Sequence, residues 1–433
     1  MWCTCSPQSE ALNIFRKLVS VEEAKQALAQ NFTPKPVGKE RVSLSQALRR
    51  VLATDIKSQL DIPPFNRSTV DGYAVKSADT FGADESNPVK LKLLGPINVG
   101  ETPKINIEKE TTAQIVTGAP IPNGADSVVI FEYTTQKGET VLIHSSVTKG
   151  ENVMKAGSDI HGCETILKKG TVLSPHEIGV LAAVGIDKVN VFKQPKVAII
   201  STGAEVVEPG KLLPAGKIYD INAYTLSASV EELGGQPVNM GIVQDETEQM
   251  TTALKKALKT ADLTMTSGGV SAGPTDIIPK VLDTLGKPGV IVYGIAIRPG
   301  KPVKMAIING KSVFSLPGHP ASALLIFHLF IRPIIVKMTG RSEELSIKIK
   351  AVTAEKLFPA KGRRTFVTVT LKRNKSGKIS AYPVPTGQSG AITTLARADG
   401  FIEIHESQQF IDAGETVTVQ LFKPDTYYSL MKE

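Results

Sequence analysis

Residues 261–276, ADLTMTSGGVSAGPTD, join a short strand to a glycine-rich loop. The strand is expected over 263–266, and the glycines after it allow positive φ angles and a close approach to a ligand. Consecutive free N–H groups in such a turn bind anions, more strongly where a helix begins next. Asp276 adds a carboxylate suited to a metal ion that bridges to a phosphate. Because an ordinary tight turn has the same local pattern, the rest of the chain must decide between the two.

The chain on either side alternates strands with helices. Residues 196–202 (KVAIIST) predict a buried strand, and Asn222 begins a helix whose apolar face includes Leu226 and Val230. A further strand and helix precede the opening segment, and a hairpin that turns at Asn309-Gly310 follows it. This alternation predicts a doubly wound α/β sheet, in which ligands bind at the carboxyl ends of the strands.

Four loops are therefore expected at one edge of this sheet. They are 201–205, 267–276, 298–301 and 316–319. They offer backbone donors, carboxylates and cations, which suit a phosphorylated ligand with Mg²⁺ better than acyl or hydride transfer. The sequence contains no GxxxxGK[ST] or HExxH motif, and no GxGxxG motif after a strand.

Structural interpretations of the same residues remain open. Glu205 can be a solvated carboxylate. Asp245, with Glu248 three residues later, has the spacing of a helix N-cap, and spacing alone favours that interpretation. Arg298 and Lys301 can be surface charges, although their rigid Pro-Gly setting favours a ligand.

Three further positions also have two interpretations. His319 follows a Pro-Gly turn and is at least as well explained as a turn residue as it is as a catalytic one. Asp71 stands in a turn sequence, and either a turn role or a binding role fits it. The pair Arg363-Arg364 is expected to be exposed, with anion binding as the alternative.

Composition excludes several classes of protein. At 433 residues the chain is too long for one core, and about three domains are expected. The net charge of +8 favours anionic ligands, but dispersed lysines and 5% aromatic residues provide no stacking platform for nucleic acid. The longest apolar run, 323–336, is interrupted by His328, Arg332 and Pro333 and predicts a buried helix, not a membrane span. With three cysteines and no signal-peptide pattern, a cytoplasmic protein is expected.

The remaining segments predict smaller structural elements. Capping boxes begin helices at Ser20 and Ser174. Apolar residues within 44–51 have helical spacing and predict another helix. Short strands over 89–147 indicate an all-β module, and strict alternation in TFVTVTL and TVTVQLF indicates that 346–422 forms a β-barrel or sandwich.

Eight short segments follow one another along the chain: PPFNRSTVDGYAV, VTGAPIPNGAD, GSDI, STGAE, YDINAYTL, TSGGVSAGPTD, RPGKP and LPGHPASA. In this order they resemble the signature segments of the molybdopterin molybdenumtransferase (MoeA) family, whose eukaryotic relative is the E domain of gephyrin. The resemblance covers the chain from about residue 20 to residue 422.

The resemblance implies an elongated chain of four subdomains that forms a homodimer. The implied subdomains are an N-terminal linking part (20–60 and 148–192), a β-rich second part (61–147), a doubly wound molybdopterin-binding α/β part (193–340) and a C-terminal β-barrel (341–433).

The resemblance also implies an activity, the last step of molybdenum cofactor synthesis. In that step molybdate is inserted into adenylylated molybdopterin with Mg²⁺, and AMP is released. The implied active site lies between the α/β part of one protomer and the β-rich part of the other. The implied upstream partner is a molybdopterin adenylyltransferase, and neither nucleic acid nor a membrane is expected.

Site residues are implied position by position. The implied catalytic residues are Asp71, Thr117, Glu205, Asp245 and Asp276, of which Glu205, Asp245 and Asp276 are also the implied metal ligands. The implied binding residues are Asp159, Ser267, Gly268, Gly269, Arg298, Lys301, Pro317 and Gly318.

Four positions depart from the family pattern. Asn66 stands where aspartate is common, Ala204 replaces an aspartate, and His319 fills a position often taken by asparagine. Arg298 replaces a lysine found in many members, which keeps the charge but changes its geometry. These departures leave open whether molybdate or tungstate is preferred. A tungstate-inserting paralogue and a gephyrin-like scaffold are the alternatives, and an adenylyltransferase is less favoured because it would not need the additional β parts.

Overall fold

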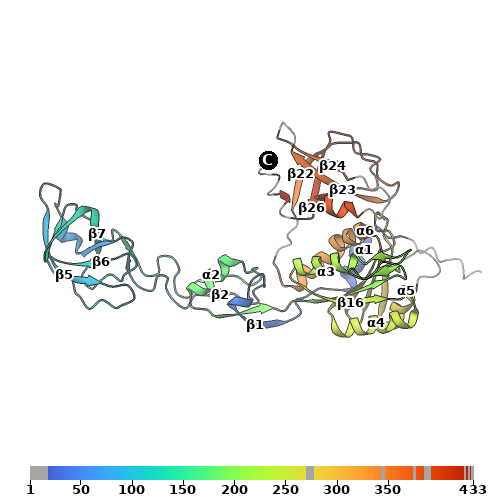
Figure 1. The fold of residues 1–433 in the computed structure, drawn as a ribbon, viewed down its shortest axis with the longest axis horizontal. Helices are drawn as coiled ribbons and strands as arrows, with labels where there is room; N and C mark the ends of the chain where they lie inside the picture. The colour runs from blue at the N-terminus through green and yellow to red at the C-terminus, as the bar shows by residue number, and fades with distance from the viewer. Residues whose placement is uncertain are drawn as a thin grey trace, which may run out of the picture. The chain divides into compact units, whose positions relative to one another are not determined.

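The computed structural model describes residues 18–269, 277–342, 347–373, 377–384, 392–423, 426–427 and 430. The chain divides into two compact units, which are described separately (Figure 1). The first comprises Met1–Glu40, Arg49–Val51 and Val191–Glu433, and the second comprises Arg41–Leu48 and Leu52–Asn190. The division into four subdomains with the boundaries given above stays a prediction.

A six-stranded sheet forms the centre of the first unit, in the order β16-β13-β17-β21-β20-β18. β20 runs antiparallel to the other five strands, which all run in one direction. The hairpin between β20 and β21 turns at Asn309 and Gly310, as predicted, and both residues have positive φ angles. The predicted doubly wound sheet is therefore confirmed. Its strands are β13 (Lys196–Thr202), β16 (Gln236–Val243), β17 (Leu263–Ser267), β18 (Pro288–Tyr293), β20 (Lys304–Ile308) and β21 (Lys311–Leu316).

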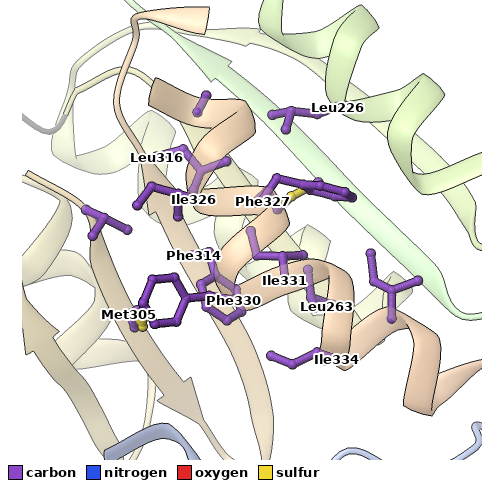
Figure 2. Packing of buried hydrophobic residues seen from close by; sticks show 14 of the residues in the cluster. Leu226, Leu263, Met305, Phe314, Leu316, Ile326, Phe327, Phe330, Ile331 and Ile334 are labelled. Carbon is purple, nitrogen blue, oxygen red and sulfur yellow. The ribbon is translucent and has the colours of Figure 1, made fainter. Parts of the chain in front are cut away.

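Helices cover both faces of this sheet (Figure 1). Helices α1, α3, α6 and α7 contribute to the apolar cluster on one face, and α4 and α5 to the cluster on the other. In Figure 2, Phe314 of β21 lies with Phe327, Phe330 and Ile331 in the first cluster. Burial of each such side chain contributes about 1.5–3 kcal/mol. The helices are α1 (Val21–Asn31), α3 (Asn222–Glu232), α4 (Thr247–Thr260), α5 (Ile278–Leu285), α6 (Pro320–Ile326) and α7 (Arg332–Met338).

The helix predicted over 323–336 is confirmed as a core element. Among the described residues, the segment Pro320–Met338 is long and apolar enough to cross a membrane by length and composition. It consists of α6, a π-helical turn η4 (Phe327–Ile331) and α7. Most of its apolar side chains are buried in the cluster shown in Figure 2, so the segment acts here as the core helix of the α/β sheet.

The C-terminal part of the first unit is a closed β-barrel. Five strands follow the order β23-β24-β22-β26-β25, and pairing of β25 with β23 closes the ring. The short strand β19 (Ile297–Arg298), which follows β18, pairs in parallel with β23. Of the two architectures that the alternation allowed, the barrel is confirmed. Its elements are β22 (Lys348–Thr353), β23 (Arg364–Arg373), β24 (Ile379–Pro383), α8 (Thr393–Arg397), β25 (Gly400–Ile404) and β26 (Thr416–Leu421).

Arg364 is buried, so the expectation that Arg363-Arg364 is exposed is wrong for this residue. Its guanidinium pairs with Glu403 (3.1 Å), Glu406 (3.0 Å) and Glu22 of α1. Burial lowers the pKa of Arg364, but hydrogen bonds to Glu406 and Glu22 outweigh burial and raise it above its ordinary value. Sequence could not predict this because the compensating carboxylates come from distant segments.

The substitution Arg364→Ala is expected to lower the free energy of unfolding by about 1–2 kcal/mol. The expected loss is modest because the three carboxylates retain solvent contact. Urea unfolding followed by circular dichroism measures it. Arg364→Lys should recover only part of the loss, since an ammonium lacks the planar fork. Arg363→Ala is the neighbouring control, and an equal loss in both alanine variants would contradict the role of the ion pairs.

The second unit contains a curled six-stranded sheet in the order β7-β4-β6-β5-β9-β8. Successive residues of β4 alternate between two apolar clusters, with Tyr73 and Val75 in one and Ala74 in the other. The all-β module predicted over 89–147 is thus observed. Its elements are β4 (Gly72–Val75), η2 (Ser77–Thr80), β5 (Val89–Ile97), β6 (Thr111–Ile115), β7 (Ser127–Ile130), η3 (Phe131–Tyr133), β8 (Thr134–Lys137) and β9 (Thr140–Ile143).

Smaller elements complete the chain. Both predicted capping boxes are confirmed, at Ser20 before α1 and at Ser174 before α2. In the second unit, β2 pairs with β11 and β3 pairs with β10. The remaining bounds are β1 (Lys39–Ser43), η1 (Leu44–Gln46), β2 (Ile56–Lys57), β3 (Arg67–Ser68), β10 (Val153–Met154), β11 (Thr165–Leu167), α2 (Pro175–Ala183), β12 (Lys188–Phe192), β14 (Val206–Val207) and β15 (Ile218–Tyr219).

The helix predicted over 44–51 is wrong. Only the 3₁₀ turn η1 (Leu44–Gln46) forms there, and Arg49 has a φ of 62°, which is incompatible with a continuing helix. Leu48 is 52% exposed, whereas Ala47 and Val51 are buried. The helical spacing of these residues therefore does not describe one buried face.

Candidate functional site

Three of the four loops predicted at one sheet edge, those that begin at 201, 267 and 316, do start at that edge. The parallel register pairs Ser201 with Ser267 and Ser267 with Leu316, so β13, β17 and β21 end side by side. Thr202, the last residue of β13, pairs with Val243, the last residue of β16. The loops after these four strands thus begin at one edge of the sheet.

Gly268 and Gly269 begin the glycine loop after β17 in a conformation that favours glycine. Their φ angles are +100° and +63°, and the amide of Gly268 donates to the carbonyl of Leu316 at 3.1 Å. A Cβ on Gly268 would lie 2.2 Å from the carbonyl oxygen of Thr202, and one on Gly269 would lie 3.1 Å from Oδ1 of Asp245. Close approach of neighbouring loops, as well as backbone conformation, therefore requires glycine at Gly268.

Asp245 is not the N-cap of α4, so the interpretation that spacing favoured is wrong. The N-cap is Glu246, which makes no side-chain capping bond, and the helix begins at Thr247. The Asp245 carboxylate instead accepts a hydrogen bond from the hydroxyl of Thr202. Asp245 thus bonds to a hydroxyl on a neighbouring strand and not to the start of its own helix. Sequence spacing cannot reveal such a contact.

Glu205 lies beside the turn that follows β13. It is exposed, and its carboxylate folds back so that a Cβ on Gly203 would meet Oε2 at 2.7 Å. Its carbonyl accepts from the amide of Ile218 at 2.8 Å, where β14 and β15 close a loop. The exposed carboxylate is thus available to a ligand at the strand ends.

Asn222 connects two of the predicted loops. This residue is only 6% exposed, and its Nδ2 donates to Oγ of Ser267 at 2.6 Å and to the carbonyl of Gly318 at 2.8 Å. Its Oδ1 is buried and has no hydrogen-bond partner among the described residues. The sequence placed Asn222 at a helix start but gave no sign of this bridge. The only available signal was its place in the segment YDINAYTL.

The basic loop after β18 approaches the barrel. Arg298 is exposed and belongs to β19, whose residues pair with Arg364 and Thr365 of β23. The carbonyl of Lys301 accepts from the amide of Ile295 at 3.1 Å, which closes the loop on itself. The strand β18 ends at Tyr293, and β19 begins only at Ile297.

The loop after β21 contributes backbone and an exposed imidazole. Pro317 is buried, whereas Gly318 and His319 are exposed. His319 occupies the N-cap position of α6 but makes no side-chain capping bond.

The second unit contains a separate pair, Asp71 and Thr117. Oδ1 of Asp71 accepts from the backbone amide of Thr117 at 2.6 Å and from its hydroxyl at 2.7 Å. These two hydrogen bonds lower the pKa of Asp71 below its ordinary value. Asp159 is exposed elsewhere in this unit, and its amide donates to the carbonyl of Ile62 at 3.0 Å.

The structure thus groups the predicted residues only in part. Ser267, Gly268, Gly269, Asp245 and Gly318 meet at the sheet edge, and Asp71 meets Thr117. Asp276 lies outside the described residues. Within the described part of the chain, no group of three or more His, Cys, Asp or Glu side chains is placed to hold a metal ion.

Three protein-family models match the chain. The MoeA N-terminal region (domains I and II) matches residues 19–185, and the MoeA C-terminal region (domain IV) matches 350–422. Between them a probable molybdopterin-binding domain matches 198–337, which contains the sheet edge described above. The doubly wound part and its strand-end loops thus define a molybdopterin-binding class of protein.

Individual relatives match this chain over most of its length. Molybdopterin molybdenumtransferase of Staphylococcus aureus (strain COL) is 33% identical over 95% of this chain and 97% of its own length. That of Bacillus subtilis (strain 168) is 34% identical over 89% and 90%. The crystal structure of a molybdopterin biosynthesis MoeA protein from Pyrococcus horikosii shares 42% identity, with a TM-score of 0.83 over 94% of this chain and all of that one. The chain belongs to the molybdopterin molybdenumtransferase (MoeA) family and is a transferase of molybdenum cofactor biosynthesis.

Proposed function

We propose that this transferase inserts molybdate into adenylylated molybdopterin and releases AMP in a Mg²⁺-dependent reaction. The observation that carries the proposal is the arrangement of Asp245 against Gly269, next to Gly268 and Ser267. It places a carboxylate beside backbone that can approach phosphate closely. A phosphoanhydride with a bound cation needs this combination.

The residues at the edge fit Mg²⁺. This ion takes oxygen ligands and is usually bound by one or two carboxylates together with substrate phosphates and water. Asp245 and Glu205 would supply carboxylate oxygens, and Asp276 is proposed as a third. When bound, Mg²⁺ would neutralise charge on the phosphoanhydride that is cleaved.

The other predicted residues receive binding roles. Ser267 and Gly269 would hold the pterin phosphate, and Gly268, whose amide donates to Leu316, would let the backbone approach it closely. Arg298 and Lys301 would hold the oxyanion, and Pro317 and Gly318 would shape the pocket beside Asn222. Such a site acts by positioning and by electrostatic stabilisation, and needs no covalent intermediate with the protein.

We also propose a homodimer in which Asp71, Thr117 and Asp159 of one protomer complete the site of the other. The lowered pKa of Asp71 supports an ionised carboxylate at neutral pH. The proposed setting is the cytoplasm, with a molybdopterin adenylyltransferase supplying the adenylylated pterin.

The direct test supplies purified protein with adenylylated molybdopterin, Mg²⁺ and molybdate. AMP release is expected, and the Glu205→Gln variant serves as the control. AMP release no faster than in this control would contradict the proposal. Pterin binding without AMP release would favour a scaffold. Release of pyrophosphate from ATP and free molybdopterin would favour an adenylyltransferase, and analysis of product formed with both oxyanions present decides between molybdate and tungstate.

The shared site predicts complementation. Co-expressed Glu205→Gln and Asp71→Ala chains should recover about a quarter of the wild-type rate, although each is inactive alone. Half of a random population is mixed dimers, and each mixed dimer contains one unmutated site of two. Activity in the mixture no higher than in either parent would exclude a site shared between protomers.

A further inference from the structure

Thr202 lies in the first of the loops predicted at the sheet edge, but the sequence indicated no role for this residue. It is the last residue of β13 and is 2% exposed. Since β13 lies between β16 and β17, Thr202 stands between the strand that precedes Asp245 and the strand that precedes Gly268.

The hydroxyl, the carbonyl oxygen and the methyl group of Thr202 each lie beside the loop of Asp245 or the glycine loop. Its hydroxyl donates to Oδ1 of Asp245. Its carbonyl oxygen is 2.2 Å from the position of a Cβ on Gly268, and its Cγ2 is 3.3 Å from that of a Cβ on Gly269. One buried residue thus bonds to the carboxylate and lies beside the glycine loop.

The hydroxyl contact fixes the carboxylate in space. Hydrogen bonds to an ionised acceptor are stronger than neutral ones. A carboxylate whose one oxygen is held in this way has its other oxygen restricted in direction. Partners of this kind orient the ligands of metal ions, and their loss typically weakens metal binding about 10–100-fold.

We propose that Thr202 is the positioning residue of Asp245 and sets the affinity of the site for a divalent cation. The inference rests on the proposed role of Asp245 as a metal ligand. It goes beyond that role, because Thr202 itself touches neither metal nor substrate in this scheme. The hydroxyl, and not the bulk of the side chain, is the part that matters.

Binding of Mn²⁺ in the presence of AMP, measured by electron paramagnetic resonance of the free ion, tests this without turnover. Thr202→Val keeps the shape but removes the donor, and should raise the dissociation constant of Mn²⁺ about tenfold. Thr202→Ser keeps the donor and should remain within about twofold of wild type.

Thr266→Val is the matched control. Thr266 lies on β17 beside Ile200, is fully buried, and its hydroxyl has no partner among the described residues. Its replacement should leave Mn²⁺ binding unchanged. Thermal unfolding of each variant separates a loss of folding from a loss of binding.

A double-mutant cycle gives the decisive outcome. In the Asp245→Asn background, Thr202→Val should have no further effect on Mn²⁺ binding. A full effect in that background would overturn the proposal, as would serine and valine variants that bind equally weakly, or wild-type protein that binds no Mn²⁺. If Mn²⁺ binding follows the predicted cycle but wild-type protein releases no AMP, the proposed reaction fails while the positioning role stands.

Discussion

Replacement of Gly268 by alanine is expected to reduce AMP release about a hundredfold. The new Cβ would meet the carbonyl oxygen of Thr202 at 2.2 Å, far inside contact distance, so either the glycine loop or the end of β13 must move. A displacement of about 1 Å at a positioning site can reduce the rate about a hundredfold. Steady-state assays at saturating substrate measure the loss.

Gly310→Ala provides the control for this substitution. Gly310 also has a positive φ, +82°, but a Cβ there would meet nothing within 4 Å. Both variants should lose about 1–2 kcal/mol of stability from the left-handed backbone. Only Gly268→Ala should lose activity, and a folded Gly268→Ala protein with normal turnover would remove the glycine loop from the site.

Acid is expected to destabilise the first unit through His328. This imidazole lies in the π-helical turn, with its ring 5.0 Å from that of Phe422 and 6.1 Å from that of Phe327. Burial and the nearby charge of Arg332 lower the pKa of His328 to about 4. The unfolded chain, with a pKa near the ordinary value of about 6.5, therefore binds more protons than the folded one between these limits. Stability contributed by the neutral ring is complete above about pH 6.5 and is lost as the pH falls toward 4.

The size of this effect follows from the pKa difference. A difference of about 2.5 units corresponds to at most about 3 kcal/mol, and the residual solvent contact of the ring reduces this to about 2 kcal/mol. Urea unfolding of wild type and His328→Leu is measured from pH 7 to pH 4. The difference between their unfolding free energies separates the contribution of His328 from general acid unfolding. The stability of the variant relative to the wild type should increase as the pH falls. A stability difference that does not change with pH would disprove the role of His328.

Local signals predicted much of the fold. The capping boxes at Ser20 and Ser174, the strand 196–202 and the turn at Asn309-Gly310 are confirmed, because each depends on residues that are close in sequence. The helix predicted over 44–51 failed because its spacing did not describe a shared buried face. The prediction that Arg364 is exposed was wrong because one of its ion-pair partners, Glu22, lies hundreds of residues away in the chain.

The candidate site divides in the same way. Loop positions at the carboxyl ends of strands follow from the alternation of elements, so the meeting of Ser267, Gly268 and Gly318 was accessible from sequence. The hydrogen bond from Thr202 to Asp245 and the bridge made by Asn222 depend on strand register. No local pattern encodes register between distant strands, so spacing alone favours the N-cap interpretation of Asp245.

The two-residue strand β19 limits how the α/β part can be exchanged between proteins. Because Ile297 and Arg298 pair with Arg364 and Thr365, the backbone that presents Arg298 is an added strand of the barrel. A recombination event that transferred the α/β sheet alone would separate Arg298 from β23, the strand that holds its backbone. In engineered chimaeras, the crossover point should therefore lie beyond the barrel, so that both parts are inherited together.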